Sequence, residues 1–595
     1  MRSFSLGPEP RRKIRRLRNG NPLSGLPLGL VDGEPIRGAL GGDAHPPQMP
    51  LPARTWFCPP HETRHGSRSF AVIVGGPNKP VQCPIVSHSK STDPQRIEPY
   101  LSDESRMEGG RAEEIAWPAN AAEASEVLSD WHARGLPVTV SGGGTGVVGG
   151  RIPFGGAILA TDRMNQILDI RSWSPASPHP CSPDPGFLGG ATMRVQAGVS
   201  WMEIQQAAAE AGYSYPPDPT EGGCFLGGTL ATNASGARSF RFGPTRVWVD
   251  ALKAALPDGR VVELRRGEHR WKGDSYTLEL TEGPPLVIPL PDWPMPPTSK
   301  STAGYHCRIG MDLIDLLVGS EGTLVIFLEA ELRLLPAPRE MLSGMLFFES
   351  EENAFRFTAA ARGNRHRGEE GVAPWSLELF GEEALDLLRE KEVPVPGDVH
   401  GAIFFEEGLA ADLAATFDEC QEAWLRLAEK HDASADSWLA DSAAEDRRFR
   451  EFRHAIPATI NEKLAERKVT KVSTDTAVPE GLAPEMIARY RRLLDARGYD
   501  HVVFGHAGDD HVHVNIIPRD PEELPAVKQT YWELIRIAIE MGGIAAAEHG
   551  LGKLKARALE MQYPGHVVER MKSIKRAFDP LWRLGRQTLF EDSNR

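Results

Sequence analysis

The sequence predicts an α+β protein with two ordered parts, and two observations support this. In the first part, glycine-rich blocks recur between short strand-like segments. Beyond about Pro336 the pattern changes, because strand-like segments there alternate with long helical ones, as in a separate α+β domain. We therefore expect an extension over residues 1–92, a first domain over residues 93–336 and a second over residues 337–595.

The composition excludes several classes of protein. The 595 residues include 67 Lys and Arg against 81 Asp and Glu, and the net charge of −14 argues against nucleic acid as the main partner. No apolar run reaches the roughly 18 residues that a membrane-spanning helix needs. The six cysteines form no CxxC pair, which excludes a recognisable zinc ribbon or iron–sulfur site and favours a reducing compartment. We expect a cytoplasmic protein, with peripheral membrane attachment as the alternative.

Residues 1–92 are rich in proline and contain a basic run from Arg11 to Arg18. No apolar segment follows this run, which argues against a secretory signal peptide. We expect a disordered extension or a start codon assigned too far upstream, and an organelle transit peptide is the remaining alternative.

The first domain contains three segments with a clear local pattern. Asn120–Gly135 has apolar residues at helical spacing and ends in glycine, which predicts a helix with a glycine at its C-terminus. Pro137–Val140 is typical of a short strand, and Val247–Leu264 predicts a hairpin with its turn at Pro257-Asp258-Gly259. The proline-rich residues 281–300 predict a loop.

The second domain is expected to combine strands and helices. Strands are predicted at Met345–Phe348, Trp375–Phe380 and Ala402–Phe405, and Leu409–Lys430 is predicted to be helical. The later elements are expected to be a strand over His501–Pro518 and helices over Pro525–Met541 and Glu560–Leu581.

Gly144-Thr-Gly146-Val-Val-Gly149 matches the dinucleotide fingerprint GxGxxG, but its context does not. That fingerprint requires a helix to begin at the third glycine, and Pro153 and Gly155 prevent a regular helix here. No Lys-Ser/Thr follows, so a Walker A loop is excluded as well. Glycines flanked by Ser141 and Thr145 can still present backbone N–H groups to a pyrophosphate. A flexible surface loop is the alternative.

Four further blocks follow in order: Pro216-Pro-Asp-Pro219, Gly227–Gly236, Thr302–Tyr305 and Gly319–Thr323. The series resembles the PCMH-type FAD-binding domain of the vanillyl-alcohol-oxidase flavoproteins. It is most similar to the branch of D-lactate, glycolate and D-2-hydroxyglutarate dehydrogenases, over about residues 95–590. The resemblance implies a two-part FAD-binding domain, a ferredoxin-like α+β cap domain that binds substrate, and a C-terminal helical segment.

The resemblance also implies which residues bind FAD. Relatives that attach flavin covalently use a histidine, and none lies in or beside Gly142–Gly146, so we expect non-covalent FAD. The expected FAD-binding residues are Ser141, Gly142, Gly143, Gly144, Thr145, Gly146, Pro217, Asp218, Gly227, Gly228, Asn233, Ser235, Gly236, Glu321, Gly322 and Ile326.

Histidines and acidic residues are concentrated over His506–Asn515 and at Glu548-His549. Alternate residues of a strand share one face, so His511, His513 and Asn515 are expected to project together. Imidazole and carboxylate groups at this density suit Zn²⁺ or Mn²⁺. A polar strand and a solvated helix start is the alternative interpretation.

The same segments resemble two motifs of the branch, GHxGDGNLHxN and (S/A)xEHGxG. The implied roles are metal ligand for His506, His513 and Glu548, catalytic base for His549, and substrate contact for Asn515.

The chain departs from the first motif at Asp510, where the family has Gly, and at His511, where it has Asn. Aspartate tolerates positive φ better than most residues. His511 is expected either to contact substrate or to compete as a metal ligand.

Arg453 and Lys471 match further site positions of the branch. A guanidinium group fits two carboxylate oxygens, so Arg453 would bind the substrate carboxylate, with an exposed helix arginine as the alternative. Lys471 is a weaker catalytic candidate. The implied reaction oxidises a D-2-hydroxy acid, with the proton taken by His549 and a hydride passed to flavin N5. The electron acceptor would be a cytochrome, a quinone or an electron-transfer flavoprotein.

Three other functions remain open from the sequence. A non-redox flavoenzyme resembling alkyl-dihydroxyacetonephosphate synthase would use the same fold, and a flavin-carrying electron-transfer subunit would lack turnover. An aryl or alditol oxidase would have no need of the proposed metal ligands. A homodimer is a further open expectation.

Overall fold

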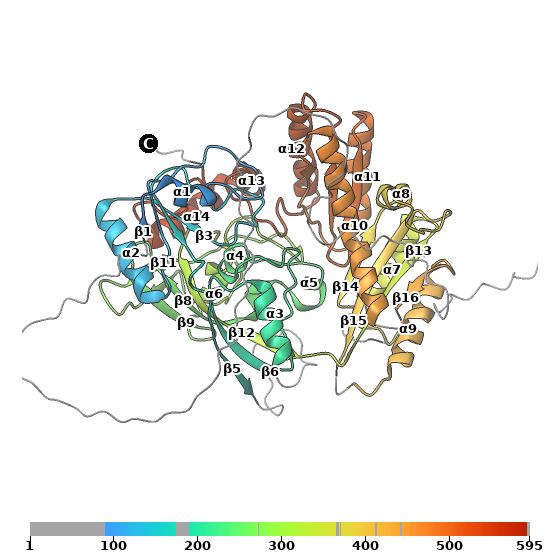
Figure 1. The fold of residues 1–595 in the computed structure, drawn as a ribbon, viewed down its shortest axis with the longest axis horizontal. Coiled ribbons are helices and arrows are strands. Elements are labelled where there is room, and N and C mark those ends of the chain that lie inside the picture. Colours follow the sequence, from blue (N-terminus) through green and yellow to red (C-terminus); the bar gives the residue numbers. More distant parts are fainter. Residues whose placement is uncertain are drawn as a thin grey trace, which may run out of the picture. The chain divides into compact units, whose positions relative to one another are not determined.

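The computed structural model describes residues 90–173, 190–271, 273–363, 368, 370–410, 413–440 and 443–591. Helices and strands occur in both halves of the chain, so the α+β prediction is confirmed (Figure 1). The predicted extension falls outside the described residues except for its last three positions. No helix in the described ranges is long and apolar enough to cross a membrane.

The first sheet has four strands in the order β1-β2-β4-β3. The bounds of its strands are Lys90–Ser91 for β1, Glu114–Ala116 for β2, Val138–Ser141 for β3 and Ala157–Ala160 for β4. Two parallel pairs, β2 with β4 and β3 with β4, form its centre. Helix α2 (Ala121–Arg134) confirms the predicted helix, since Asn120 caps its first turn and Gly135 ends it at a φ of 77°.

The second sheet is antiparallel, in the order β5-β6-β12-β8-β9, with β7 paired to β12. The strands are β5 (Ile167–Trp173), β6 (Gly190–Gln196), β7 (Tyr213–Ser214), β8 (Val249–Ala255), β9 (Val261–Arg265) and β12 (Ile326–Pro336). Strands β8 and β9 form the predicted hairpin. The helices of this part are α1 (Pro94–Ile97), η1 (Glu98–Tyr100), α3 (Trp201–Glu210), α4 (Leu226–Thr232), α5 (Ser239–Phe242), η2 (Thr245–Trp248) and α6 (Leu313–Leu317).

The proline-rich segment is not entirely a loop. Strand β11 (Leu286–Pro289) lies within it and pairs with β10 (Ser275–Leu278). Alternation explains this strand, because the side chains of Leu286 and Ile288 are buried while Val287 between them is exposed. The remainder of residues 281–300 contains no helix or strand.

The second domain is built on a seven-stranded antiparallel sheet, in the order β16-β13-β15-β14-β18-β19-β17 (Figure 1). The strands are β13 (Glu340–Phe348), β14 (Ser376–Phe380), β15 (Gly401–Leu409), β16 (Trp438–Leu439), β17 (Val472–Ser473), β18 (His501–His506) and β19 (His511–Ile516). The three predicted strands of this domain are confirmed. Its helices are α7 (Glu351–Gly363), α8 (Glu382–Glu390), α9 (Phe417–Lys430), α10 (Ala443–Arg467), α11 (Ala483–Ala496) and α12 (Leu524–Glu540).

Three predicted elements have different bounds in the structure. Helix α9 starts at Phe417 rather than near Leu409, because Thr416 and Glu419 form a capping box. The single strand predicted over His501–Pro518 is the hairpin of β18 and β19. The single C-terminal helix is two, α13 (Arg557–Gln562) and α14 (Gly565–Phe578), because Pro564 lies between them.

Helix α14 packs against the first domain rather than the seven-stranded sheet. Its buried residues, such as Met571 and Ile574, belong to the same hydrophobic cluster as Leu316 and Leu334. Lys575 donates from Nζ to the carbonyl oxygen of Thr323 at 2.6 Å. The end of the chain therefore returns to the glycine-rich domain.

Candidate active site and metal centre

Three histidines lie on one face of the β18–β19 hairpin. His506 and His511 are direct partners across the two strands, and direct partners place their side chains on the same face. His513 lies two residues beyond His511 and therefore shares that face. The ring centroids are separated by 5.3 Å for His506–His511 and 4.5 Å for His511–His513. The hairpin register is thus what brings the three imidazoles together.

Asp510 occupies the left-handed position at the turn of this hairpin, with a φ of 49°. Its carboxylate lies 2.7 Å from Nη2 of Arg362. It also accepts the backbone N–H groups of Gly481 and Ala483. Asp510, which replaces the glycine of the family motif, is therefore held by Arg362 and two backbone N–H groups. Its carboxylate faces these groups rather than the histidines.

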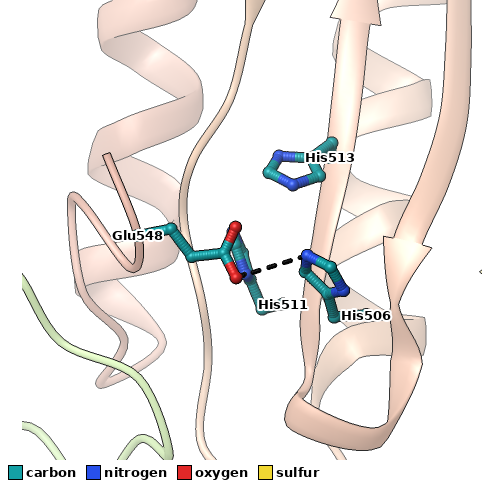
Figure 2. Close-up of side chains that lie close together, drawn as sticks. All are labelled: His506, His511, His513 and Glu548. Atoms are coloured by element: carbon teal, nitrogen blue, oxygen red, sulfur yellow. Dashed lines mark ion pairs between the residues drawn. The ribbon is translucent and has the colours of Figure 1, made fainter. Parts of the chain in front are cut away.

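Glu548 completes the cluster from the loop that follows α12 (Figure 2). The potential ligand atoms of His506, His511, His513 and Glu548 all lie within 4.8 Å of one another. Oε1 of Glu548 is 3.3 Å from Nε2 of His506 and 3.8 Å from Nδ1 of His511. This donor set of imidazoles and a carboxylate fits a divalent transition metal.

Each imidazole also turns one ring nitrogen toward an acceptor outside the cluster. Nδ1 of His506 lies 2.6 Å from Oε1 of Glu378, and Nδ1 of His513 lies 2.9 Å from the carbonyl oxygen of Thr474. Such outer acceptors orient a histidine so that its other nitrogen can bind a metal. The cluster therefore has the donor atoms that a metal site needs, and it also has the outer acceptors that orient its histidines.

Three residues of the site were not predicted from the sequence: Lys300, Glu378 and Asp475. Buried Lys300 donates from Nζ to Oε1 of Glu548 at 2.5 Å and to the carbonyl oxygen of Gly236 at 2.9 Å. Asp475 accepts the backbone N–H groups of Glu548 and His549. Lys300 and Glu378 lie in no motif that the sequence indicates. Asp475 lies in the segment Lys471–Pro479, which also resembles the branch, but its contacts with the cluster are visible only in the fold.

The buried charges shift the protonation of the cluster. Burial alone would lower the pKa of His506, but the carboxylates of Glu378 and Glu548 outweigh it and raise the pKa to about 9. Burial would raise the pKa of Glu378, but His506 and Arg453 lower it to about 2. His506 therefore lies between two buried carboxylates, a setting that favours positive charge.

Three further residues were predicted to be catalytic: Arg453, Asn515 and Lys471. Arg453, on α10, places Nε 3.4 Å from Oε2 of Glu378, which also holds His506. The Asn515 side chain is buried on β19, and its Nδ2 has no hydrogen-bond partner among the described residues. Lys471 is exposed just before β17, and its catalytic role stays a prediction.

His549 combines exposure with an oriented ring. Its side chain is 37% exposed, and Nδ1 lies 3.5 Å from Oδ2 of buried Asp475. The ring is nearly parallel to that of His513, with centroids 5.8 Å apart. A partly exposed imidazole beside a carboxylate and a potential metal centre is suited to take a proton from a ligand bound there.

The glycine loop after β3 packs on the segment just before the Gly227–Gly236 block. A Cβ on Gly143 would lie 2.9 Å from the carbonyl oxygen of Gly223, and one on Gly142 would contact Phe225. Gly144 has a φ of 83°, which side chains other than glycine rarely adopt. No helix follows over the described residues 142–156, as the sequence predicts. Close packing at Gly143 and left-handed backbone at Gly144 therefore require glycine in this loop, and its contact with a pyrophosphate stays a prediction.

The later blocks of the predicted FAD site also touch one another. A Cβ on Gly236 would collide with the carbonyl oxygen of Asp218, so these two blocks are in backbone contact. Asn233 adopts a φ of 51° at the end of α4, and its Oδ1 accepts the backbone N–H of Arg246. Ser235 donates from Oγ to Oε1 of Glu548 at 3.2 Å. Ser235 thus lies at the boundary between the glycine-rich blocks and the histidine cluster.

The last block connects to the segment that carries Glu548. Glu321 accepts the backbone N–H groups of Leu551 and Gly552 at 2.9 and 2.7 Å, and burial raises its pKa to about 7. Gly322 follows with a φ of 66°, and Ile326 is buried in the cluster that covers α2. The predicted FAD contacts of these three residues stay predictions.

Two family models match the chain. Residues 112–265 match the FAD binding domain, and residues 337–588 match the C-terminal domain of FAD linked oxidases. The chain belongs to the FAD-linked oxidases. The first match includes the glycine loop, and the second includes the histidine cluster and His549.

Relatives of this FAD-linked oxidase extend over most of its length. A D-lactate dehydrogenase of Archaeoglobus fulgidus is 28% identical over 78% of this chain and 88% of its own. A D-2-hydroxyglutarate dehydrogenase of Xanthomonas citri pv. viticola is 28% identical over 84% and 94%. The glycolate oxidase subunit GlcD of Bacillus subtilis is 27% identical over 78% and 86%. These relatives confirm the branch that the motifs indicate.

Solved structures confirm the fold of the FAD-linked oxidase. An alkyldihydroxyacetonephosphate synthase superposes with a TM-score of 0.58 over 84% of this chain and 83% of its own, at 15% identity. A likeness at this identity concerns the fold alone. The fold is thus shared with this synthase, and a shared fold does not by itself imply a shared function.

Proposed function

We propose that this FAD-linked oxidase is a D-2-hydroxy acid dehydrogenase that converts a substrate of the D-lactate, glycolate or D-2-hydroxyglutarate class to the 2-oxo acid. The observation that carries the proposal is the position of His549, partly exposed and 5.8 Å from the ring of His513 in the histidine cluster. The names of the relatives support the same substrate class.

Substrate binding is assigned to Arg453 and Asn515. The Arg453 guanidinium is largely buried beside Glu378, and a guanidinium binds a carboxylate through two parallel hydrogen bonds. The unpaired Nδ2 of buried Asn515 would donate to a substrate oxygen, which removes the cost of leaving this donor unsatisfied. Asn515 lies on β19 of the hairpin that carries the histidines, and Arg453 contacts Glu378, which holds His506.

His549 is assigned as the general base. Asp475 fixes the backbone of His549 through its N–H group and faces Nδ1, which leaves Nε2 to take the proton of the substrate hydroxyl. Burial of Asp475 would raise the pKa of its carboxyl, but His549 and Lys555 keep this pKa well below its usual range. The carboxylate therefore stays charged and stabilises the protonated ring.

Two bound groups would complete the site. FAD, held without a covalent bond by the glycine blocks, supplies the acceptor for the hydride from the substrate carbon. A divalent ion such as Zn²⁺ or Mn²⁺, held by His506, His513 and Glu548, supplies a Lewis acid that favours loss of the hydroxyl proton. The electrons would then pass to a cytochrome, a quinone or an electron-transfer flavoprotein.

A stopped-flow screen tests the proposed function. D- and L-lactate, glycolate and D- and L-2-hydroxyglutarate are mixed without oxygen with the oxidised, FAD-bound protein, and flavin absorbance is followed. We expect the D-enantiomers to bleach the flavin and the L-enantiomers to leave it oxidised. The site fixes the substrate carboxylate and hydroxyl, so only one enantiomer can direct its Cα–H toward the flavin. Absence of bleaching by every 2-hydroxy acid would contradict the proposal and favour the non-redox or electron-transfer alternatives.

A further inference from the structure

We propose that His511 is a fourth protein ligand of the metal centre, which then has three imidazoles and one carboxylate. This inference rests on the proposed function, since it concerns the same metal. It goes beyond the ligand set of His506, His513 and Glu548, because the motif of the family has asparagine at this position. The chain itself supplies the reasons.

The position of His511 is the first reason. It is the direct partner of His506 across the hairpin, and its Nδ1 lies 3.8 Å from Oε1 of Glu548. Its ring centroid lies only 4.5 Å from that of His513. A potential ligand atom of His511 therefore lies within 4.8 Å of one from each of the other three residues.

The unsatisfied Nδ1 of His511 is the second reason. The residue is fully buried, and its Nδ1 has no hydrogen-bond partner among the described residues. A buried polar group without a partner is costly, and native proteins rarely keep one without a reason. A metal ion at Nδ1 would satisfy the nitrogen that faces Glu548.

The outer contact of His511 is the third reason. Nε2 lies 3.4 Å from Oδ1 of Asp475, which is itself held by the backbone N–H groups of Glu548 and His549. This repeats the arrangement of His506 with Glu378, in which one nitrogen faces a buried carboxylate and the other faces Glu548. A carboxylate–histidine arrangement of this kind is typical of metal ligands.

Four protein donors restrict which ion leaves room for substrate. A four-coordinate Zn²⁺ bound by all four would be closed, as in structural zinc sites. An ion that accepts five or six ligands, such as Mn²⁺, keeps positions for the hydroxyl and carboxylate oxygens of a 2-hydroxy acid. We therefore expect Mn²⁺ to support substrate binding better than Zn²⁺ does.

Pulsed electron paramagnetic resonance of the full-length, FAD-bound protein loaded with Mn²⁺ tests the inference, because it counts the imidazole nitrogens bound to the ion. We expect three in the wild type and two in His511→Asn, which restores the family residue. The matched control is His400→Asn, since the His400 side chain is half exposed, pairs with Glu382 and is not one of the grouped donors. This control should keep three imidazole nitrogens bound to Mn²⁺. Chelator competition should show Mn²⁺ affinity lowered at least about tenfold in His511→Asn.

Two imidazoles in the wild type, unchanged in His511→Asn, would overturn the inference and leave the proposed function intact. A wild type that binds no Mn²⁺ would overturn both the inference and the metal centre of the proposed function. The wild-type count needs no variant to fold, so it decides the question even if His511→Asn is unstable.

Discussion

Asp475 Oδ2 lies 3.5 Å from Nδ1 of His549 and also accepts the backbone N–H of the same residue at 3.1 Å. Asp475 is almost fully buried, and the third contact of Oδ2 is Nζ of Lys555 at 3.0 Å. One carboxylate thus holds both the main chain and the ring of the proposed base.

This relationship predicts that Asp475→Asn slows flavin reduction while FAD stays bound. An amide is neutral and cannot stabilise a protonated imidazole as a carboxylate does, so we expect a loss of about tenfold or more in the reduction rate. Stopped-flow absorbance with a D-2-hydroxy acid measures this rate. Asp495→Asn, an exposed aspartate beside His501, serves as the control and should reduce normally.

Replacement of the base itself should have a larger effect. We expect His549→Ala to bind substrate but to reduce flavin about 10²–10⁴-fold more slowly, the usual contribution of a positioned base. Substrate binding can be followed by perturbation of the flavin spectrum before reduction. His566→Ala, at an exposed position of α14, is the matched control. An unchanged reduction rate in His549→Ala would remove it from the mechanism.

The glycine loop predicts a contrast between two nearby alanine substitutions. Gly144 has a φ of 83° and its Cβ would collide with Arg151, whereas a Cβ on Gly150 would meet no atom within 4 Å. Left-handed backbone costs alanine about 1–2 kcal/mol, so Gly144→Ala should weaken FAD binding about tenfold. Fluorescence titration of the apoprotein with FAD measures the affinity. Equal affinities for Gly144→Ala and Gly150→Ala would argue against a role of this loop in FAD binding.

The Asp510–Arg362 pair predicts a non-additive effect on stability. Arg362→Leu leaves the buried Asp510 carboxylate without its cation, which typically costs about 3–5 kcal/mol. Arg362→Leu with Asp510→Gly removes both charges and places glycine at a φ of 49°, so the double variant should regain most of the loss. Thermal unfolding midpoints test this order. A double variant less stable than Arg362→Leu would contradict the predicted recovery.

Glu321 predicts a pH-dependent contribution to stability. Burial raises the pKa of its carboxyl from an ordinary value of 4.5 to about 7 in the folded protein. A group with a higher pKa in the folded state stabilises it most below pH 4.5, and this stabilisation is lost as the pH rises through 7. Glu321→Gln does not titrate, so its unfolding midpoint relative to the wild type should be higher at pH 8 than at pH 5. If the difference in unfolding midpoint between Glu321→Gln and the wild type did not change with pH, the raised pKa of Glu321 would be contradicted.

The sequence by itself determined the features that depend on local order. Apolar spacing and the capping residues Asn120 and Gly135 predict α2, because helix ends satisfy their backbone groups with near neighbours. The ordered glycine blocks identify the FAD-binding domain. The histidine motif predicts that His506, His513 and Glu548 lie together, as the structure finds.

Only the tertiary structure decided which groups surround that motif. Lys300, Glu378 and Asp475 reach the cluster from three separate segments, and their contacts depend on packing between residues more than 30 positions apart. The turn at Asp510 depends on Arg362, which lies 148 positions earlier. The hairpin register then places His511 opposite His506. Sequence spacing carries no record of such pairings, because they arise when distant strands and loops are buried together.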